Sequence, residues 1–304
     1  GLTLSNLSGD FHITNNGSTL QSLSIQFPES HITFADIKLN YDGWNNLLQG
    51  LKQHSVTLKT LNNSHVSLSD FRGLSPALEN FDATLSLEID ITGTLDTLSI
   101  NELAISSQEE NISLTINGTL NNIMNVDSIR ADIKELSLKG YGSDIADILL
   151  LNRKISPKGA SVLSKLGQIS FDGKITGTTH LADVDGYLNT SNGNVALHTQ
   201  IVRPLRSKTI TFTGKIDGND VNIGNIISNN DLGKISATVN HNITLLPNAI
   251  KGNISSEVTQ AEYKGYCYSG LNTLINLDDN KIDGSLNIAD NNINLTLAGE
   301  AILN

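Results

Sequence analysis

The sequence predicts an all-β fold, an elongated and curled sheet of many short strands with a few short helices. Apolar and polar residues alternate in segment after segment, which is the period of a half-buried strand. Asn-Gly, Asp-Gly, Asp-Asp-Asn and Asn-Asn sequences, which suit hairpin turns, separate these segments. Aromatic residues make up only 5% of the 304 residues, so the apolar side of such a sheet must consist mainly of Leu, Ile and Val.

Two short helices are predicted before the clearest strands. Asp42 suits the N-cap of a helix over 42–54, and a second helix is expected near 69–79 behind Ser69. In both segments the apolar residues recur at helical spacing and share one side of the helix. They are Trp44, Leu47, Leu48 and Leu51 in the first, and Phe71, Leu74 and Leu78 in the second.

Two alternating segments follow, TLSLEIDI at 84–91 and NISLTI at 111–116. Every second residue is aliphatic, so in a strand the aliphatic side chains share one face. These residues are Leu85, Leu87, Ile89, Ile91, Ile112, Leu114 and Ile116.

A helical break interrupts the strands near 143–166. Ser143 begins SDIADILLLN, and a second helix has Ser156 as N-cap, Pro157 at its first position and Gly167 at its end. The predicted organisation is therefore a β-groove segment over 1–142, a helical insertion over 143–167, and a segment over 168–304 that continues the sheet.

The segments after the break again alternate, with glycines on the apolar face. Phe171, Gly173, Ile175 and Gly177 share a face, and Asp183 to Gly186 is predicted to be a turn. The apolar residues predicted to form the floor of a groove in this half are Phe171, Ile175, Ile210, Phe212, Ile216, Ile282, Leu286, Ile288, Ile293, Leu295 and Leu297.

Charge and composition exclude several function classes. The 20 basic and 31 acidic residues give a net charge of −11, whereas a nucleic-acid partner requires a basic surface. Cys267 is the single cysteine, so no disulfide can form within the chain. The longest apolar run, at 145–151, is far below the roughly 20 residues that span a bilayer. Any membrane anchor is expected to lie outside this sequence.

Catalytic motifs are absent from the sequence, which contains no GxSxG, P-loop, HExxH or paired CxxC. His180, Asp183 and Asp185 lie close together but are interpreted as a solvated turn rather than a metal site. The tyrosines of YKGYCYSG at 263–270 could stack a sugar or base, although a strand whose tyrosines cover the sheet is the favoured interpretation. We therefore expect no enzymatic activity, no cofactor and no metal.

One family resembles the sequence over essentially its whole length. FDGKITGTTHLADVDGYLNTSNGNVALHTQI at 171–201 resembles the F-x-G-x-(I/F)-x-G … G-x-L-x-T-x-x-G repeat of the TamB (translocation and assembly module) family of Bacteroidota, within the AsmA-like superfamily. In sequence order, LNYDGWNNL, LSDFRGLSPAL, ITGTLDTLSINELAI, FTGKIDGNDVNIGNIISNNDLGKISATV, YKGYCYSGL and IDGSLNIADNNINLTLAGEAIL are also similar. IADNN at 288–292 departs from the pattern, because a proline is expected after the Asp.

The resemblance implies a β-taco, a folded gutter with an apolar concave face, in a periplasmic bridge. It further implies an inner-membrane anchor and an outer-membrane Omp85-type (TamA-like) partner, both reached through regions outside this segment. The family is associated with phospholipid movement to the outer membrane and with outer-membrane protein assembly.

Three functions remain open on the sequence alone. The first is a non-enzymatic conduit that guides phospholipid acyl chains along the apolar groove. The second is a chaperone-like module that assists outer-membrane protein assembly by β-strand pairing. The third is a structural stalk or adhesin with a closed core. An apolar face that no second layer covers would favour the first, because exposed apolar surface on that scale normally marks a binding site.

Overall fold

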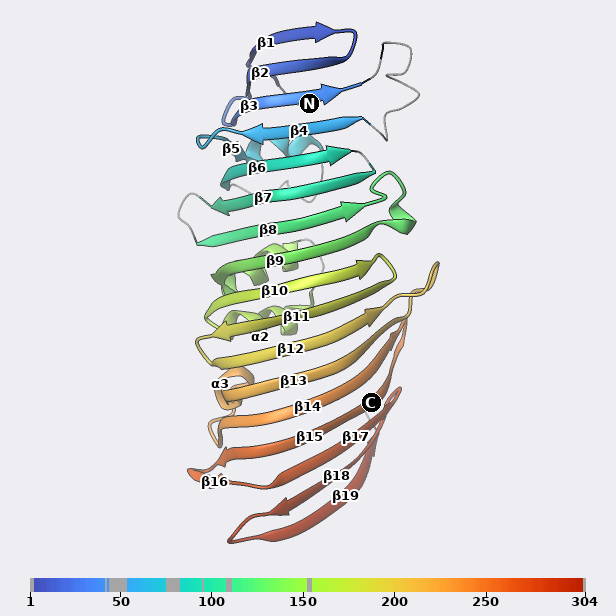
Figure 1. Ribbon diagram of the computed structural model, residues 1–304. Helices are drawn as coiled ribbons and strands as arrows, with labels where there is room; N and C mark the ends of the chain where they lie inside the picture. The colour runs from blue at the N-terminus through green and yellow to red at the C-terminus, as the bar shows by residue number, and fades with distance from the viewer. Residues whose placement is uncertain are drawn as a thin grey trace. The chain divides into compact units, whose positions relative to one another are not determined.

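A computed structural model describes residues 3–41, 43, 54–74, 83–94, 96–107, 111–151 and 155–302. These residues form antiparallel β-sheet with a few short helices (Figure 1), which confirms the predicted all-β class. The chain divides into two compact units, unit 1 (Gly1–Ala160) and unit 2 (Ser161–Asn304). The boundary falls inside the segment 143–167 that the sequence predicts to be a helical insertion.

Unit 1 is an antiparallel sheet in which each strand pairs with the next, except that β4 and β5 share the place between β3 and β6. Its strands are β1 (Asn6–Thr14), β2 (Gly17–Gln26), β3 (His31–Asn40), β4 (Ser55–Thr60), β5 (His65–Ser67), β6 (Thr84–Thr94), β7 (Thr97–Ser107), β8 (Ile112–Asn121) and β9 (Arg130–Tyr141). Its described residues also form the 3₁₀ helices η2 (Leu68–Leu74) and η4 (Val126–Ser128) and the α-helix α1 (Gly142–Leu151).

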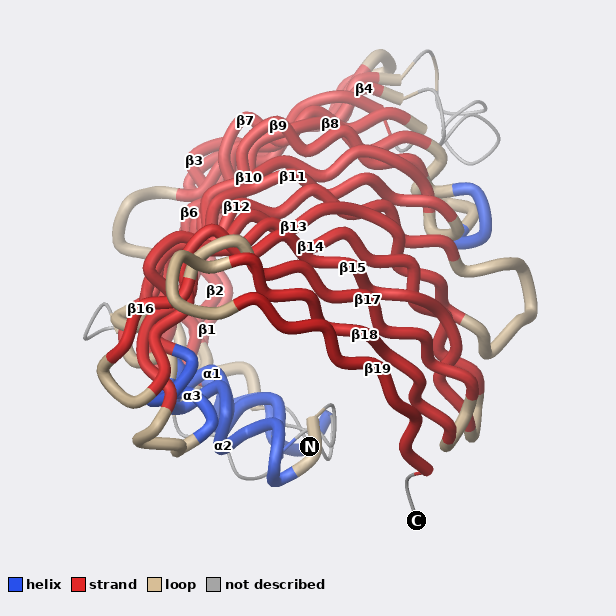
Figure 2. Tube along the Cα trace, turned by 90° about the horizontal axis from the view of Figure 1, so that it is seen from below, coloured by secondary structure: helices blue, strands red, loops and turns tan. Residues whose placement is uncertain are grey.

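Unit 2 is also a single antiparallel sheet, in which β15 pairs with both β16 and β17. Its strands are β10 (Gln168–Thr178), β11 (Leu181–Thr190), β12 (Gly193–Val202), β13 (Ile210–Asn222), β14 (Leu232–Leu246), β15 (Ala249–Tyr263), β16 (Tyr266–Tyr268), β17 (Leu271–Asp278), β18 (Lys281–Ala289) and β19 (Asn294–Ile302). Helix α2 (Pro157–Lys165) crosses the unit boundary, and α3 (Ile223–Ile227) follows β13. Within each unit the strands bend along their length, so the sheet is curled (Figure 2).

The strand registers give each sheet one apolar and one polar face. In unit 1, Ile105 lies opposite both Leu87 and Leu114. In unit 2, Ile216 lies opposite both Leu197 and Val239. Residues at paired positions point to the same side of a sheet, and side chains alternate along each strand. We call the side that carries these aliphatic residues the apolar face and the other side the polar face.

The helical predictions have mixed outcomes. Helix α2 begins at Pro157 as predicted, the Gly159 N–H donates to Ser156 Oγ at 3.1 Å, and Gly167 follows the helix with φ 68°. Helix α1 begins at Gly142, one residue before the predicted start. Turn η2 covers the described part of the predicted helix at 69–79, whereas almost all of the predicted helix at 42–54 lies outside the described residues.

The predicted turn from Asp183 to Gly186 is wrong, because these residues lie inside β11. The chain turns instead at 179–180, where the N–H groups of His180 and Leu181 donate to Thr178 Oγ1 at 3.2 Å. Asp-Gly is a turn signal when considered locally, but cross-strand pairing overrides it here. Several other Asp-Gly pairs also lie within strands, among them Asp217-Gly218 and Asp283-Gly284.

Helix α1 covers only one end of the unit 1 sheet. A Cβ built on Gly140 of β9 would lie 3.5 Å from Ile145 Cδ1, so α1 packs on the apolar face. In Figure 2 this helix lies on the inner side of the curl. The apolar face of unit 1 is therefore the concave face. Helix α1 leaves most of this face uncovered.

Candidate functional site

The structure places the predicted groove residues on the apolar faces of the two sheets. In unit 1 these are Leu85, Leu87, Ile89, Ile91, Ile112, Leu114 and Ile116. In unit 2 these are Phe171, Ile175, Ile210, Phe212, Ile216, Ile282, Leu286, Ile288, Leu295 and Leu297. Ile293 is the exception, since it precedes β19 and is not part of a strand.

The apolar faces are partly open to solvent. Nearly all of the predicted groove residues are half-buried; Ile288 is buried at 9% exposure, whereas Leu297 is 51% exposed. At the edge of unit 1, Phe11 of β1 is 62% exposed. No large side chain among the described residues has less than 2% exposure, although a core between two packed layers would bury alternate side chains fully. Each unit therefore presents aliphatic surface that no second sheet formed by its described residues covers.

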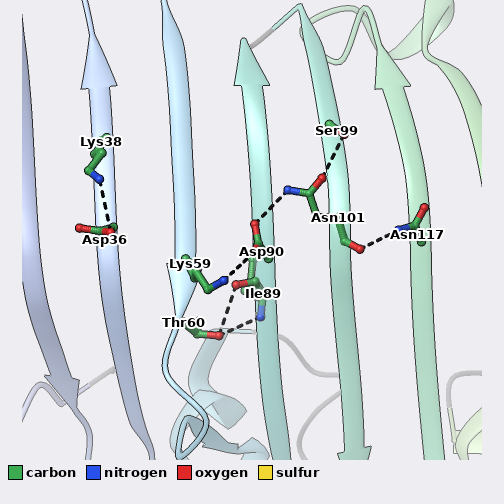
Figure 3. Close-up of polar contacts among 9 residues, drawn as sticks. All are labelled: Asp36, Lys38, Lys59, Thr60, Ile89, Asp90, Ser99, Asn101 and Asn117. Atoms are coloured by element: carbon green, nitrogen blue, oxygen red, sulfur yellow. Dashed lines mark hydrogen bonds and ion pairs between the residues drawn. The ribbon is translucent and has the colours of Figure 1, made fainter.

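The apolar faces also lack charge, because no paired position of these faces in the described strands carries Asp, Glu, Lys or Arg. On the polar face of unit 1, Lys59 Nζ lies 2.8 Å from Asp90 Oδ2, and Asn101 Nδ2 donates to Asp90 Oδ1 at 3.0 Å (Figure 3). The hydrogen bond from Lys59 lowers the pKa of Asp90. At the paired positions of the described strands, charged side chains are thus confined to the polar face.

The polar face of unit 2 shows the same arrangement. Asp185 contacts His198 Nδ1, which lowers the pKa of Asp185, and Lys174 Nζ lies 3.5 Å from the same carboxylate. Further along, Lys251 pairs with Asp278 at 2.8 Å. Exposed pairs of this kind contribute little stability each, so their main effect is to keep this face hydrated.

Phe171 covers a pair of glycines that face each other across β10 and β11. Gly173 lies opposite Gly186, and a Cβ built on Gly186 would lie 2.5 Å from Phe171 Cζ. The corresponding distance from Gly173 is 2.8 Å. The ring therefore occupies the space that two missing side chains leave on the apolar face, an arrangement known from other sheets as aromatic rescue of glycine.

A second glycine pair, Gly284 of β18 and Gly299 of β19, has no such cover. A Cβ built on Gly299 would meet no atom within 4 Å. The result is a shallow hollow of about 260 Å³, which we call the glycine hollow. Its lining residues are Thr273, Ile275, Gly284, Ser285, Leu286, Leu297, Ala298 and Gly299. The sequence alone does not predict this hollow, because the pairing of Gly284 with Gly299 depends on strand register.

Two hydrogen-bonded polar pairs also lie on the apolar face of unit 2, and alternation within single strands predicts neither of them. Ser256 of β15 lies opposite Thr273 of β17, with 2.7 Å between their hydroxyl oxygens. Thr199 Oγ1 lies 3.3 Å from His241 Nε2, across the intervening Gly214. His241 Nδ1 is buried without a hydrogen-bond partner, and burial lowers the pKa of this imidazole.

The tyrosines at 263–270 do not form a flat surface for stacking; two of them pack edge to face, and one is hydrogen-bonded to a carboxylate. The rings of Tyr266 and Tyr268 meet edge to face with 4.5 Å between centroids. Tyr266 Oη donates to Asp290 Oδ1 at 2.7 Å. The pKa of Asp290 is lowered to about 2, because the Asn292 N–H and then the Tyr266 hydroxyl donate to this carboxylate. The tyrosine bond joins β16 to the turn between β18 and β19, and Cys267 between the tyrosines is exposed.

Neither a metal-binding cluster nor a membrane-spanning helix is found among the described residues. Among them, no three or more His, Cys, Asp or Glu side chains are placed to hold a metal ion. Asp183 instead accepts a hydrogen bond from Gln200, and Asp185 contacts His198. None of the helices in the described part of the chain has the length and apolarity needed to cross a membrane.

The fold and its surfaces define a class, that of curled antiparallel sheets with one apolar face that the described residues leave largely uncovered. Comparison with family models, curated proteins and solved structures found no match to the chain. The resemblance to the TamB family is therefore still a prediction from the sequence.

Proposed function

We propose that the chain is a non-enzymatic segment of a lipid-conducting bridge, in which the apolar faces of the two units hold phospholipid acyl chains. The observation that carries this proposal is that each apolar face is mainly aliphatic, carries no charge at the paired positions of its described strands, and is half-exposed. Such a surface suits a ligand that is itself apolar and uncharged along most of its length.

Acyl chains gain free energy when they leave water for an apolar surface. Exposing an acyl chain to water costs about 0.8 kcal/mol per methylene, or roughly 24 kcal/mol for a two-chain lipid with about 30 methylenes. Contact with an aliphatic face offsets part of this cost without any chemistry. Because aliphatic contacts are non-directional, a bound chain can slide along the strands.

The cellular setting is part of the proposal and rests on the sequence resemblance. We place the segment in the periplasm, between an inner-membrane anchor and an outer-membrane Omp85-type (TamA-like) partner. Both would be reached through regions outside this sequence.

A second candidate function is chaperone-like assembly of outer-membrane proteins by strand pairing. The observation that favours it is β19, which among the described residues pairs only with β18, so that its other backbone edge is unpaired. An exposed edge can accept an extended segment of another protein. A closed-core stalk or adhesin is the least favoured function, because it requires a cover over the apolar face that neither unit provides from its own described strands.

The substitution Leu87→Arg tests the proposal. Leu87 is a half-buried residue of the apolar face, and its neighbour Glu88 is exposed on the polar face. We expect Leu87→Arg to slow phospholipid transfer between donor and acceptor vesicles at least tenfold, because a charge on an apolar surface is costly to desolvate. The matched variant Glu88→Arg should transfer lipid at the wild-type rate.

Circular dichroism of both variants checks that the sheet is intact. Normal transfer by a folded Leu87→Arg variant would contradict the conduit. If the same variant also kept its activity in outer-membrane protein assembly, strand pairing at the edge would become the better explanation.

A further inference from the structure

We propose that the Ser256–Thr273 pair and the adjoining glycine hollow form a subsite that hydrogen-bonds the ester carbonyl groups of a diacyl glycerolipid. This inference rests on the proposed function, since it specifies where the polar backbone of a bound lipid lies on the apolar face of unit 2. The subsite lies where β15, β17, β18 and β19 run side by side.

The hydroxyl pair has a hydrogen to donate. When two hydroxyls bond to each other, one donates and the other accepts, so the hydrogen of the accepting hydroxyl is not used. The 2.7 Å separation of Ser256 Oγ and Thr273 Oγ1 is such a bond. Both residues are half-buried and Thr273 lines the glycine hollow, so the pair borders a surface that a ligand can contact. An ester carbonyl is an acceptor without a hydrogen of its own and matches it.

The surroundings of the pair select a neutral acceptor over an anionic one. Ser256 lies opposite Val239, and Thr273 lies opposite Leu286. No Lys or Arg occupies a paired position of this face in the described strands. A phosphate group would lack a counter-charge and lose its hydration here, whereas a carbonyl group loses much less.

The glycine hollow supplies the space for the branched part of the lipid. Thr273 lines the hollow together with Ile275, Leu286 and Leu297. The hydroxyl pair and the hollow are therefore parts of one surface, polar at one border and aliphatic elsewhere. The ester region of a glycerolipid has the same character, a short polar segment continued by apolar chains.

The test compares two phospholipids that share chains and headgroup but carry either ester or ether linkages to glycerol. Because one net hydrogen bond contributes about 1 kcal/mol, we expect the wild-type chain to bind the diester about fivefold more tightly than the diether. In the double variant Ser256→Ala with Thr273→Val, diester affinity should fall to that of the diether. Unchanged diether affinity in this variant also shows that the surface is folded.

A matched control is Thr213→Val on the polar face, where Thr213 Oγ1 donates to Asn242 Oδ1 at 3.2 Å. This variant loses a cross-strand hydroxyl bond of the same sheet and should keep the fivefold preference. Equal binding of both lipids by the wild-type chain, or a preference that survives in the double variant, would overturn the subsite but not the lipid-binding function. If neither lipid bound, the proposed function would fail, and the subsite with it.

Discussion

In both glycine pairs on the apolar face of unit 2 the two glycines lie directly opposite each other, but the surroundings of the two pairs differ. Gly173 and Gly186 lie beneath the ring of Phe171, whereas Gly284 and Gly299 border an open hollow. The residue two positions before the first glycine is Phe171 in one case and Ile282 in the other. An isoleucine is too short to cover both glycines.

This difference shows how one sheet can combine stability with binding capacity. Glycine weakens a strand, because it loses more backbone entropy on folding than other residues and provides no side chain to pack. An aromatic ring offsets that cost at β10 and β11. At β18 and β19 the cost is not offset, and the uncovered space is available to a ligand.

The largest expected effect comes from removing the cover. Phe171→Ala should lower the free energy of unfolding by about 2 kcal/mol, below the 3–5 kcal/mol typical of fully buried Phe because the ring is half-buried. Urea denaturation measures the change. A loss below about 0.5 kcal/mol would mean that the ring does not support the glycine pair.

Adding a methyl group to each glycine pair sharpens the comparison. At Gly186 the new Cβ would meet Phe171 Cζ at 2.5 Å and the Asp172 carbonyl oxygen at 2.9 Å, so Gly186→Ala should cost about 1–2 kcal/mol through overpacking. At Gly299 nothing lies within 4 Å, so Gly299→Ala should be neutral or stabilise by about 0.5 kcal/mol. Thermal denaturation of the two variants side by side measures the difference, and equal effects would refute the contrast.

The third test places an aromatic ring over Gly284 and Gly299, the glycine pair that has no cover in the wild-type chain. Ile282→Phe should place a ring over Gly284 and Gly299, as Phe171 does over its own pair, and fill the glycine hollow. We expect about threefold weaker binding of a diester phospholipid, with the free energy of unfolding unchanged or higher. Phospholipid affinity that stays at the wild-type value in a folded Ile282→Phe variant would show that the hollow is not occupied by lipid.

A smaller, pH-dependent effect is expected from His241, which lies on the same apolar face. Burial lowers the pKa of His241 below its ordinary value near 6.5, so between the two pKa values the unfolded chain binds more protons than the folded one. Stability should therefore fall as pH drops through about 6.5. The variant His241→Phe should show a shallower decline between pH 7.5 and 5.5 in denaturation experiments.

The control for this pH dependence is His12→Gln, since His12 is exposed on β1 in unit 1. It should leave the slope as it is in the wild-type chain. If His241→Phe left the slope equally unchanged, His241 would not be the group whose protonation opposes folding.

The sequence was sufficient to predict which residues share a face, because alternation fixes that property within a single strand. Alternation assigns three residues of β6 to the apolar face without any information on the neighbouring strands: Leu85, Leu87 and Ile89. The sequence was insufficient at Asp185-Gly186. The Asp-Gly pair predicts a turn, but in the structure these residues pair with Lys174 and Gly173 inside the sheet.

The features of the candidate site that depend on several strands could not be predicted. The glycine hollow and the Ser256–Thr273 pair arise from strand register, which brings together residues that are far apart in sequence. Helix α3 was missed because its five residues are too few to show helical periodicity.

The most direct test of the central claim is photo-crosslinking from the two sides of one strand. A photoreactive residue is placed at Leu114, on the apolar face of β8, or at Thr115, exposed on the polar face. We predict that with phospholipid vesicles the residue at position 114 forms a lipid adduct, detected by mass spectrometry, and that the residue at 115 does not. Adducts of equal yield at both positions, or none at position 114, would contradict the claim that the apolar face carries lipid.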